Sequence, residues 1–246
     1  MPDGLLFLHA FPLDSTMWAP QLARFDRVAA VAPDFPGFGR ASAGGSVMEM
    51  SVAADIGAAA LDDRGVERAV VCGLSMGGYV ALEFWRRHPG RVAGLVLANT
   101  RAGDDDEAGK ARREALAQRL EAEGSAFLVE SPPPLLSKGA SEDLWKRVKE
   151  IIRAQPARAI AAASRGMAAR PDFTPVLASI SVPTLVITST GDELIPREPT
   201  EAMGRQIPGA TIEVIENAGH LSNLEAPDEF NRLLAALLKR CGIEPD

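Results

Sequence analysis

The feature of this chain that most restricts its fold is a set of six short apolar runs, each continuous and not alternating with polar residues. Such runs are typical of strands that are buried on both faces of a sheet. They span residues 5–8, 28–31, 69–72, 95–98, 184–187 and 211–215. Helical patterns separate them, and strands that alternate with helices form a parallel sheet covered on both sides. The sequence therefore predicts an α/β fold around a mainly parallel sheet of about six strands.

Helical patterns fill much of the chain between and after these runs. Residues 52–61 are rich in alanine, and residues 227–239 carry large apolar side chains on one face. Residues 79–87 end in two arginines, which His88 and Pro89 follow. Basic residues in a last turn and a proline just beyond it are typical of a helix end, and we expect His88 to cap that end.

One long segment interrupts the alternation. From residue 101 to about residue 175 the chain has no convincing strand pattern. Three helical patterns occupy residues 108–123, 141–154 and 157–169. We interpret this segment as a helical insertion after the fourth strand. The predicted organisation is a core domain formed by residues 1–100 and 176–246, with an insertion at residues 101–175.

A candidate nucleophile lies between the third strand and the next helix. Ser75 is the centre of Gly73-Leu74-Ser75-Met76-Gly77-Gly78, which matches the G-x-S-x-G nucleophile elbow in the required context. Small residues on both sides let the neighbouring backbone approach, and the turn exposes the hydroxyl at the carboxyl edge of the sheet. The alternative is a glycine-rich turn with a solvated serine. We predict that Ser75 is a nucleophile.

A serine nucleophile needs a general base, and the chain has only three histidines. His220 follows the last predicted strand, at the sheet edge where sites of open α/β sheets are formed, so it is the predicted base. The base in turn needs a carboxylate that orients it. Asp192 follows the fifth strand and completes the chain order serine, aspartate, histidine. Glu193 and the run of residues 104–106 are the alternatives.

Two backbone N–H groups are expected to stabilise an oxyanion on the substrate. One is the N–H of Met76, directly after the nucleophile. The other is expected from the loop after the first strand, residues 9–12, where Pro12 has no N–H and Phe11 is the candidate. The substrate pocket is expected to be mainly apolar. Its candidate residues are Phe11, Met76, Trp145, Leu194 and Leu221. For Trp145 the equal alternative is simple packing of its helix.

Composition excludes several other classes of protein. The net charge of −7 argues against a nucleic-acid partner, which calls for a basic patch. Cys72 and Cys241 form neither a disulfide framework nor a zinc pattern, so no metal site is expected. The chain has no run of about 18 apolar residues, so no membrane span is predicted. The N-terminus lacks the features of a signal peptide. We therefore expect a cytoplasmic protein that acts on a small molecule, with its oligomeric state left open.

Several segments together resemble the α/β-hydrolase superfamily over nearly the whole chain. They are residues 8–15 (LHAFPLDS), 34–39 (DFPGFG), 73–78 (GLSMGG), 191–192 (GD) and 219–225 (GHLSNLE). Within the superfamily the chain is most similar to small bacterial carboxylesterases and to 3-oxoadipate enol-lactonases. The resemblance implies that the insertion is a helical lid, or cap, that the substrates are small esters or lactones, and that no cofactor is needed.

Two departures from the family pattern affect these expectations. The family usually has His-Gly where this chain has His9-Ala10, which implies a slightly tighter oxyanion loop. The chain also begins almost at the strand that relatives reach after an N-terminal hairpin, so we expect a shortened sheet without an antiparallel edge strand. Both His9 and Asp34 are expected to have structural roles: His9 should form hydrogen bonds to the loops around the oxyanion hole, and Asp34 should brace the turn at Pro36-Gly37.

The leading functional hypothesis is a serine hydrolase that cleaves small carboxylic esters through an acyl-enzyme. The first alternative is an enol-lactone hydrolase, whose carboxylated substrate needs a cation in the pocket. Arginines at positions 101, 165, 170 and 197 are candidates for that cation. Other chemistry on the same triad, such as amide or carbon–carbon bond cleavage, lies further off. A ligand-sensing or signalling protein that retains a hydrolase triad is the alternative from another class.

Overall fold

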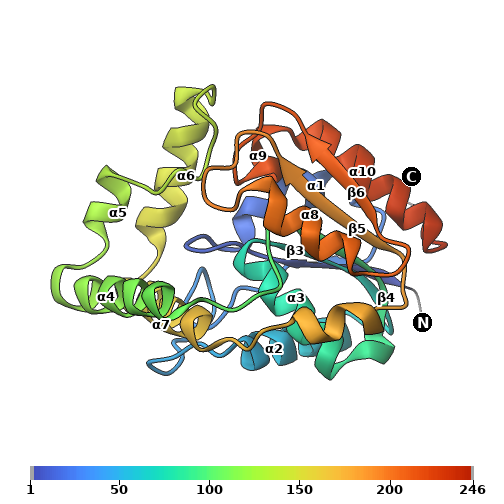
Figure 1. The fold of residues 1–246 in the computed structure, drawn as a ribbon, viewed down its shortest axis with the longest axis horizontal. Coiled ribbons are helices and arrows are strands. Elements are labelled where there is room, and N and C mark those ends of the chain that lie inside the picture. Colours follow the sequence, from blue (N-terminus) through green and yellow to red (C-terminus); the bar gives the residue numbers. More distant parts are fainter. Residues whose placement is uncertain (1–2, 245–246) are drawn as a thin grey trace.

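A six-stranded, wholly parallel sheet lies at the centre of the molecule, in a computed structural model that describes residues 3–244 (Figure 1). The strand order is β2-β1-β3-β4-β5-β6, and each neighbouring pair is parallel. The strands are β1 (Gly4–Leu8), β2 (Ala30–Val31), β3 (Ala69–Leu74), β4 (Val92–Ala98), β5 (Thr184–Ser189) and β6 (Thr211–Ile215). Among residues 3–244 the sheet has no antiparallel partner, as predicted.

Burial follows position in the sheet. The residues of β1, β3, β4 and β5 are all buried, whereas the edge strands β2 and β6 are largely half-buried. The second strand is shorter than the predicted residues 28–31, because the Val28 N–H donates to the Phe25 carbonyl (3.0 Å) in a turn after the preceding helix. Continuous apolar runs thus mark the strands that helices cover on both sides.

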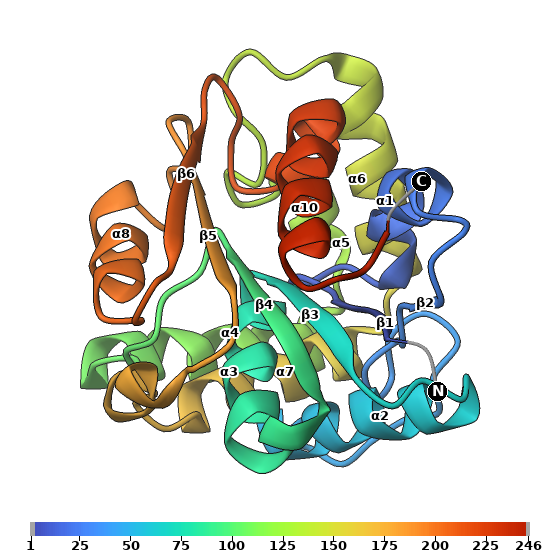
Figure 2. The ribbon, with the colours of Figure 1, turned by 90° about the vertical axis from the view of Figure 1, so that its right-hand side faces the viewer.

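Helices cover both faces of the sheet (Figure 2). On one face lie α1 (Ala19–Arg24) and α10 (Pro227–Arg240), and on the other lie α2 (Met50–Asp63) and α3 (Met76–Arg87). Near β5 and β6 packs α8 (Arg197–Arg205). Short elements complete this part: η1 (Ser15–Trp18), η2 (Pro89–Arg91) and α9 (Ser222–Glu225). All strands therefore present their carboxyl ends at one edge, where loops to these helices begin.

Along the chain, four α-helices lie between β4 and β5, and in space they lie beyond one end of the sheet (Figure 1). They are α4 (Glu107–Glu123), α5 (Ala126–Glu130), α6 (Glu142–Ala154) and α7 (Ala157–Ala169), and η3 (Thr174–Ser179) follows them. α4 and α7 lie side by side, whereas α6 extends away from them. Helix α5 was not predicted, because five residues are too few to show a helical period.

No helix within residues 3–244 combines the length and the apolar character that a membrane crossing requires.

Candidate active site

Ser75 occupies a strained turn between β3 and α3. Its φ of 58° and ψ of −117° lie in a region that residues other than glycine rarely adopt. The turn is held by the Ser75 N–H, which donates to the Ala98 carbonyl (2.9 Å). A Cβ atom on Gly73 would lie 2.1 Å from the Gly77 carbonyl oxygen, so this crossing of backbone requires a residue without a side chain. The residues of this turn therefore hold Ser75 in a backbone conformation that is neither helical nor extended.

A buried histidine–aspartate pair lies on the loops after β6 and β5. The Nδ1 atom of His220 is 2.9 Å from Oδ2 of Asp192, and both residues are buried. Burial of the Asp192 carboxyl opposes its ionisation, but the hydrogen bond and charge of His220, with the Ile195 amide, outweigh burial and lower the pKa of Asp192. When Nδ1–H donates to this carboxylate, Nε2 of His220 is left to accept a proton.

Asn99, which was not predicted as a site residue, fixes the aspartate from a third strand end. It follows β4 at a φ of 46°, and its Nδ2 donates to Asp192 Oδ2 (2.9 Å) and to Ser189 Oγ (2.7 Å). Its Oδ1 accepts from Ser222 Oγ (2.6 Å). The available signal was an asparagine at the carboxyl end of the fourth apolar run, beside the ends that carry the other site residues.

The alternative carboxylates have other partners. Glu193 forms an exposed ion pair with Lys138 (2.7 Å). Asp106 caps α4 by accepting from the Gly109 N–H (2.6 Å), and Asp104 is exposed. Asp105 is buried among three arginines and is described below with the cavity. None of these four carboxylates contacts His220 among the interactions of residues 3–244.

A cavity of about 660 Å³ opens at Ser75 and His220. Of the predicted pocket residues, Phe11 and Leu194 line it. Met76 and Leu221 are fully buried beside it, and Trp145 lines a different cavity. Further walls come from α3, from the β5–α8 loop, from α8 and from the segment between β4 and β5: Tyr79, Leu116, Phe127, Leu128, Pro133, Leu135, Met167, Ile195, Pro196 and Pro199. The wall is thus apolar around the reacting groups.

Four arginines give the same cavity a cationic side that was not predicted as a set. They are Arg101, Arg112, Arg113 and Arg119, the last three from α4. Together with Gly109 and Leu116 these α4 residues recur every three or four positions, which places them on one face of the helix. That spacing is visible in the sequence, but on a charged helix it does not tell which face points into the cavity.

Asp105 organises part of this cationic side. Its carboxylate accepts hydrogen bonds from Arg101, from Arg113 and from Arg170 (3.0 Å). Burial opposes ionisation of Asp105, but Arg170 and Arg113 hold its pKa well below the ordinary range. Arg170 is itself buried and stacks on the Tyr79 ring at 4.1 Å from the centroid. One carboxylate among three guanidinium groups leaves a net positive charge at the cavity wall.

The other arginines proposed from the sequence lie outside the cavity. Arg165 pairs with Glu114 (2.9 Å) and Glu121 (2.6 Å), which joins α7 to α4. Arg197 pairs with Glu201 (2.8 Å) on α8. Of the four candidates only Arg101 lines the cavity, while Arg170 lies one layer behind it.

His9 and Asp34 brace the loops beside the site, in agreement with the structural role expected for them. The Nε2 atom of His9 accepts from the Phe35 N–H (3.1 Å), and Nδ1 contacts the Ala10 carbonyl (3.1 Å). Asp34 accepts from the Ser15 N–H (2.8 Å) and the Arg40 N–H (2.9 Å). Among residues 3–244 no group of three or more His, Cys, Asp or Glu side chains is arranged to hold a metal ion.

Comparisons with known proteins agree with this architecture. The model of the alpha/beta hydrolase family matches residues 5–233. A 3-oxoadipate enol-lactonase of Acinetobacter baylyi is 31% identical over 244 residues, which cover 96% of this chain and 88% of that protein. A thermophilic esterase from Thermogutta terrifontis, solved with malate bound, has a TM-score of 0.94 at 36% identity, covering 98% of this chain and 91% of that one. An esterase from Exiguobacterium antarcticum shares the fold, with a TM-score of 0.86 at 21% identity over 97% of this chain and 92% of that one.

A parallel sheet with a serine turn and a buried histidine–aspartate pair at its carboxyl edge defines the class of α/β hydrolases. The chain belongs to the alpha/beta hydrolase family, as its match over residues 5–233 shows. The resemblance inferred from the sequence is therefore confirmed, and the protein is a hydrolase whose relatives include esterases and lactonases.

Proposed function

We propose that this protein is a serine hydrolase that cleaves small carboxylic esters through an acyl-enzyme. Ser75 is the nucleophile, His220 the general base and Asp192 the acid that orients the histidine. The observation that carries the proposal is that Ser75 and His220 line one cavity, with the Asp192 carboxylate 2.9 Å behind the histidine ring. The esterase with 36% identity and the enol-lactonase with 31% identity support acyl chemistry.

The reaction follows two steps of acyl transfer. Ser75 Oγ attacks the carbonyl carbon while His220 Nε2 takes its proton, and the tetrahedral oxyanion accepts hydrogen bonds from the Met76 and Phe11 N–H groups. Met76 is the first residue of α3, where N–H groups have no intrahelical carbonyl to bind. His220 then protonates the leaving alcohol. Water repeats the sequence on the acyl-enzyme and releases the acid and Ser75.

A second candidate is a hydrolase for lactones or esters that carry a carboxylate. The specific observation in its favour is the cationic side of the cavity, with Arg101 and Arg113 held by Asp105. Guanidinium groups bind carboxylates in a two-pronged geometry, which suits an anionic substrate. The esterase from Thermogutta terrifontis, solved with malate, and the enol-lactonase relative point the same way.

The insertion at residues 101–175 is proposed as a lid over this site. Residues of α4, of α5 and of α7 all contribute to the cavity wall, so the insertion closes the side of the site opposite the sheet edge. Exclusion of water by such a cover strengthens the electrostatic interactions inside. The core then consists of residues 1–100 and 176–246.

Hydrolysis of p-nitrophenyl esters from acetate to decanoate, with Ser75→Ala as the control, tests the proposal. Serine-dependent turnover with a chain-length optimum supports the esterase. Including the hemisuccinate beside the neutral butyrate separates the two candidates, because a preference for the charged ester of at least about tenfold in kcat/KM is expected only when arginine binds it. Stoichiometric or absent turnover in a folded protein that a serine-directed phosphonate still labels contradicts the esterase and favours a lactonase with a narrow substrate or a sensor.

A further inference from the structure

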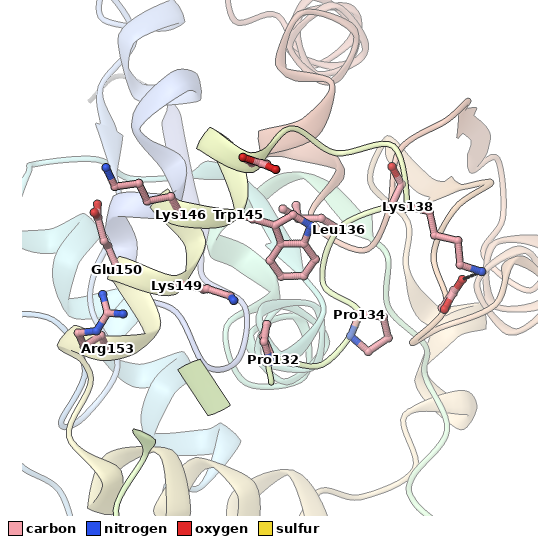
Figure 3. Close-up of a pocket in the computed structure, with 12 residues that line it drawn as sticks. Pro132, Pro134, Leu136, Lys138, Trp145, Lys146, Lys149, Glu150 and Arg153 are labelled. Atoms are coloured by element: carbon pink, nitrogen blue, oxygen red, sulfur yellow. Dashed lines mark ion pairs between the residues drawn. The ribbon is translucent and has the colours of Figure 1, made fainter. Parts of the chain in front are cut away.

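A second cavity lies on the outer side of the segment that follows α5. Its volume is about 810 Å³, and it is bounded by α6, by residues 132–138 and by Glu193 (Figure 3). Apolar walls come from Pro132, Pro134, Leu136 and Trp145. The remaining wall residues are Ser137, Lys138, Glu142, Lys146, Lys149, Glu150 and Arg153. We call this space the outer cavity.

One cation of α6, Lys149, points toward these apolar walls. Figure 3 shows Lys149 extending from α6 into the space between the Trp145 ring and Pro132, whereas Lys146, Glu150 and Arg153 lie to the other side of the helix. The Lys149 side chain is half-buried and makes no ion pair with residues 3–244, in contrast to Lys138, which pairs with Glu193 (2.7 Å). An unpaired ammonium beside an aromatic ring and two prolines suits a ligand with an apolar ring and one anionic group.

The outer cavity shares a wall with the active site. Within residues 131–136 the side chains alternate: Ser131, Pro133 and Leu135 line the active-site cavity, whereas Pro132, Pro134 and Leu136 line the outer cavity. Such alternation is that of an extended chain, so the wall is one chain thick. We call residues 131–137 the shared wall.

The shared wall is bonded to the loop that carries His220. The Leu221 N–H donates to the Leu135 carbonyl (2.9 Å). Glu225 accepts from the Ser137 N–H (3.0 Å) and the Gly219 N–H (2.8 Å), so one carboxylate joins the wall to the residue before His220. Three hydrogen bonds thus connect the shared wall to Gly219 and Leu221, the residues on either side of His220.

We propose that the outer cavity is a binding site for a small amphipathic acid, an aromatic or alicyclic body with one carboxylate or sulfonate, and that its occupancy changes turnover at the active site. The anionic group binds Lys149 and the ring packs between Trp145 and the wall prolines. A ligand in this position presses on the shared wall and so shifts the loop that holds His220. The binding claim is independent of the proposed function, whereas the effect on turnover rests on it.

Binding is tested by the fluorescence of 8-anilinonaphthalene-1-sulfonate titrated with the whole protein. Three matched variants each replace one cation by methionine: Lys149→Met, Arg147→Met on the exposed side of α6, and Arg101→Met in the active-site cavity. We expect saturable binding that weakens about tenfold in Lys149→Met, as expected when a charge-assisted hydrogen bond is lost, and stays unchanged in the other two. No saturable binding, or weakening in Arg101→Met instead, overturns the proposal.

Coupling is tested with the same probe and the same variants. At a saturating concentration of the probe, KM or kcat for p-nitrophenyl acetate is expected to change about fivefold or more in the unsubstituted protein and in Arg147→Met. In Lys149→Met the same change in KM or kcat should require a higher probe concentration, by the same factor as the loss of affinity. Bound probe that leaves both constants unaltered contradicts the coupling. Basal turnover of Ser75→Ala is measured separately and is expected to be lost. This control distinguishes a failure of the proposed function from a failure of this inference.

Discussion

A fall in pH should destabilise this protein through His9, well before its carboxylates are protonated. The His9 ring is fully buried, and its two nitrogens are used by the Ala10 carbonyl and the Phe35 N–H. These partners assign a neutral ring, with Nδ1–H donating and Nε2 accepting. Burial lowers the pKa of His9 to about 4, although the Ala10 carbonyl and the carboxylates of Asp34 and Asp14 oppose the shift.

The sign and size of the effect follow from linkage. In the unfolded chain His9 titrates near 6.5, so below that pH the unfolded state takes up a proton that the native state refuses. Stability is therefore lost as the pH falls from 6.5 towards 4. The two pKa values give a loss of about 2 kcal/mol at pH 5, relative to pH 7.5, and a limit of about 3 kcal/mol below pH 4.

Urea unfolding at pH 7.5 and pH 5.0, followed by circular dichroism, measures this loss. His9→Gln removes the titrating group, so its free energy of unfolding should change much less between the two pH values. Nuclear magnetic resonance of labelled histidine gives a direct check, since the chain has only three. A His9 ring that titrates near 6.5 in the native protein, or an equal loss of stability in His9→Gln, would contradict a role for His9 in acid destabilisation.

Three further predictions concern the site and its support. Asp192→Asn should lower kcat for p-nitrophenyl acetate by about 10⁴-fold, since an amide stabilises the wrong histidine tautomer; an unchanged kcat would contradict the role of Asp192 as the acid. Asp105→Asn should lower the free energy of unfolding in urea by about 3 kcal/mol, because it leaves buried Arg170 without its carboxylate, while the exposed Asp104→Asn should change it by less than about 0.5 kcal/mol. Ser75→Gly should raise that free energy by about 1 kcal/mol by relieving the positive φ, whereas Ser75→Ala should not; equal stability of the two variants would count against strain at the turn.

Strand ends were predictable from the sequence because local signals specify them. The runs at residues 69–72 and 184–187 become β3 and β5, and a parallel sheet brings their carboxyl ends to one edge. Ser75, Asp192 and His220 follow three of these ends, so their proximity could be predicted without any tertiary information. The chain order then selects Asp192 over the acidic run of residues 104–106.

The walls of the cavity were much less predictable, because they depend on how the helices between β4 and β5 pack. The α4 helix carries charges on all sides, and only its contact with α7, through pairs such as Arg165 with Glu114, decides that Arg112 and Arg113 face the cavity. Trp145 was a pocket candidate from the segment of residues 101–175, with simple packing of its helix as the equal alternative. It lies instead on the outer cavity, because the shared wall stands between it and Ser75. Side-chain direction across an insertion is a tertiary property that periodicity does not contain.

Rapid-quench mass spectrometry of the protein mixed with p-nitrophenyl butyrate shows whether Ser75 carries the acyl group. We expect a burst of about one equivalent of p-nitrophenol per chain and a butyryl group on the peptide that contains Ser75, both absent in Ser75→Ala. Turnover that persists in Ser75→Ala, or a butyryl group found only on another residue, would contradict the assignment of Ser75 as the nucleophile.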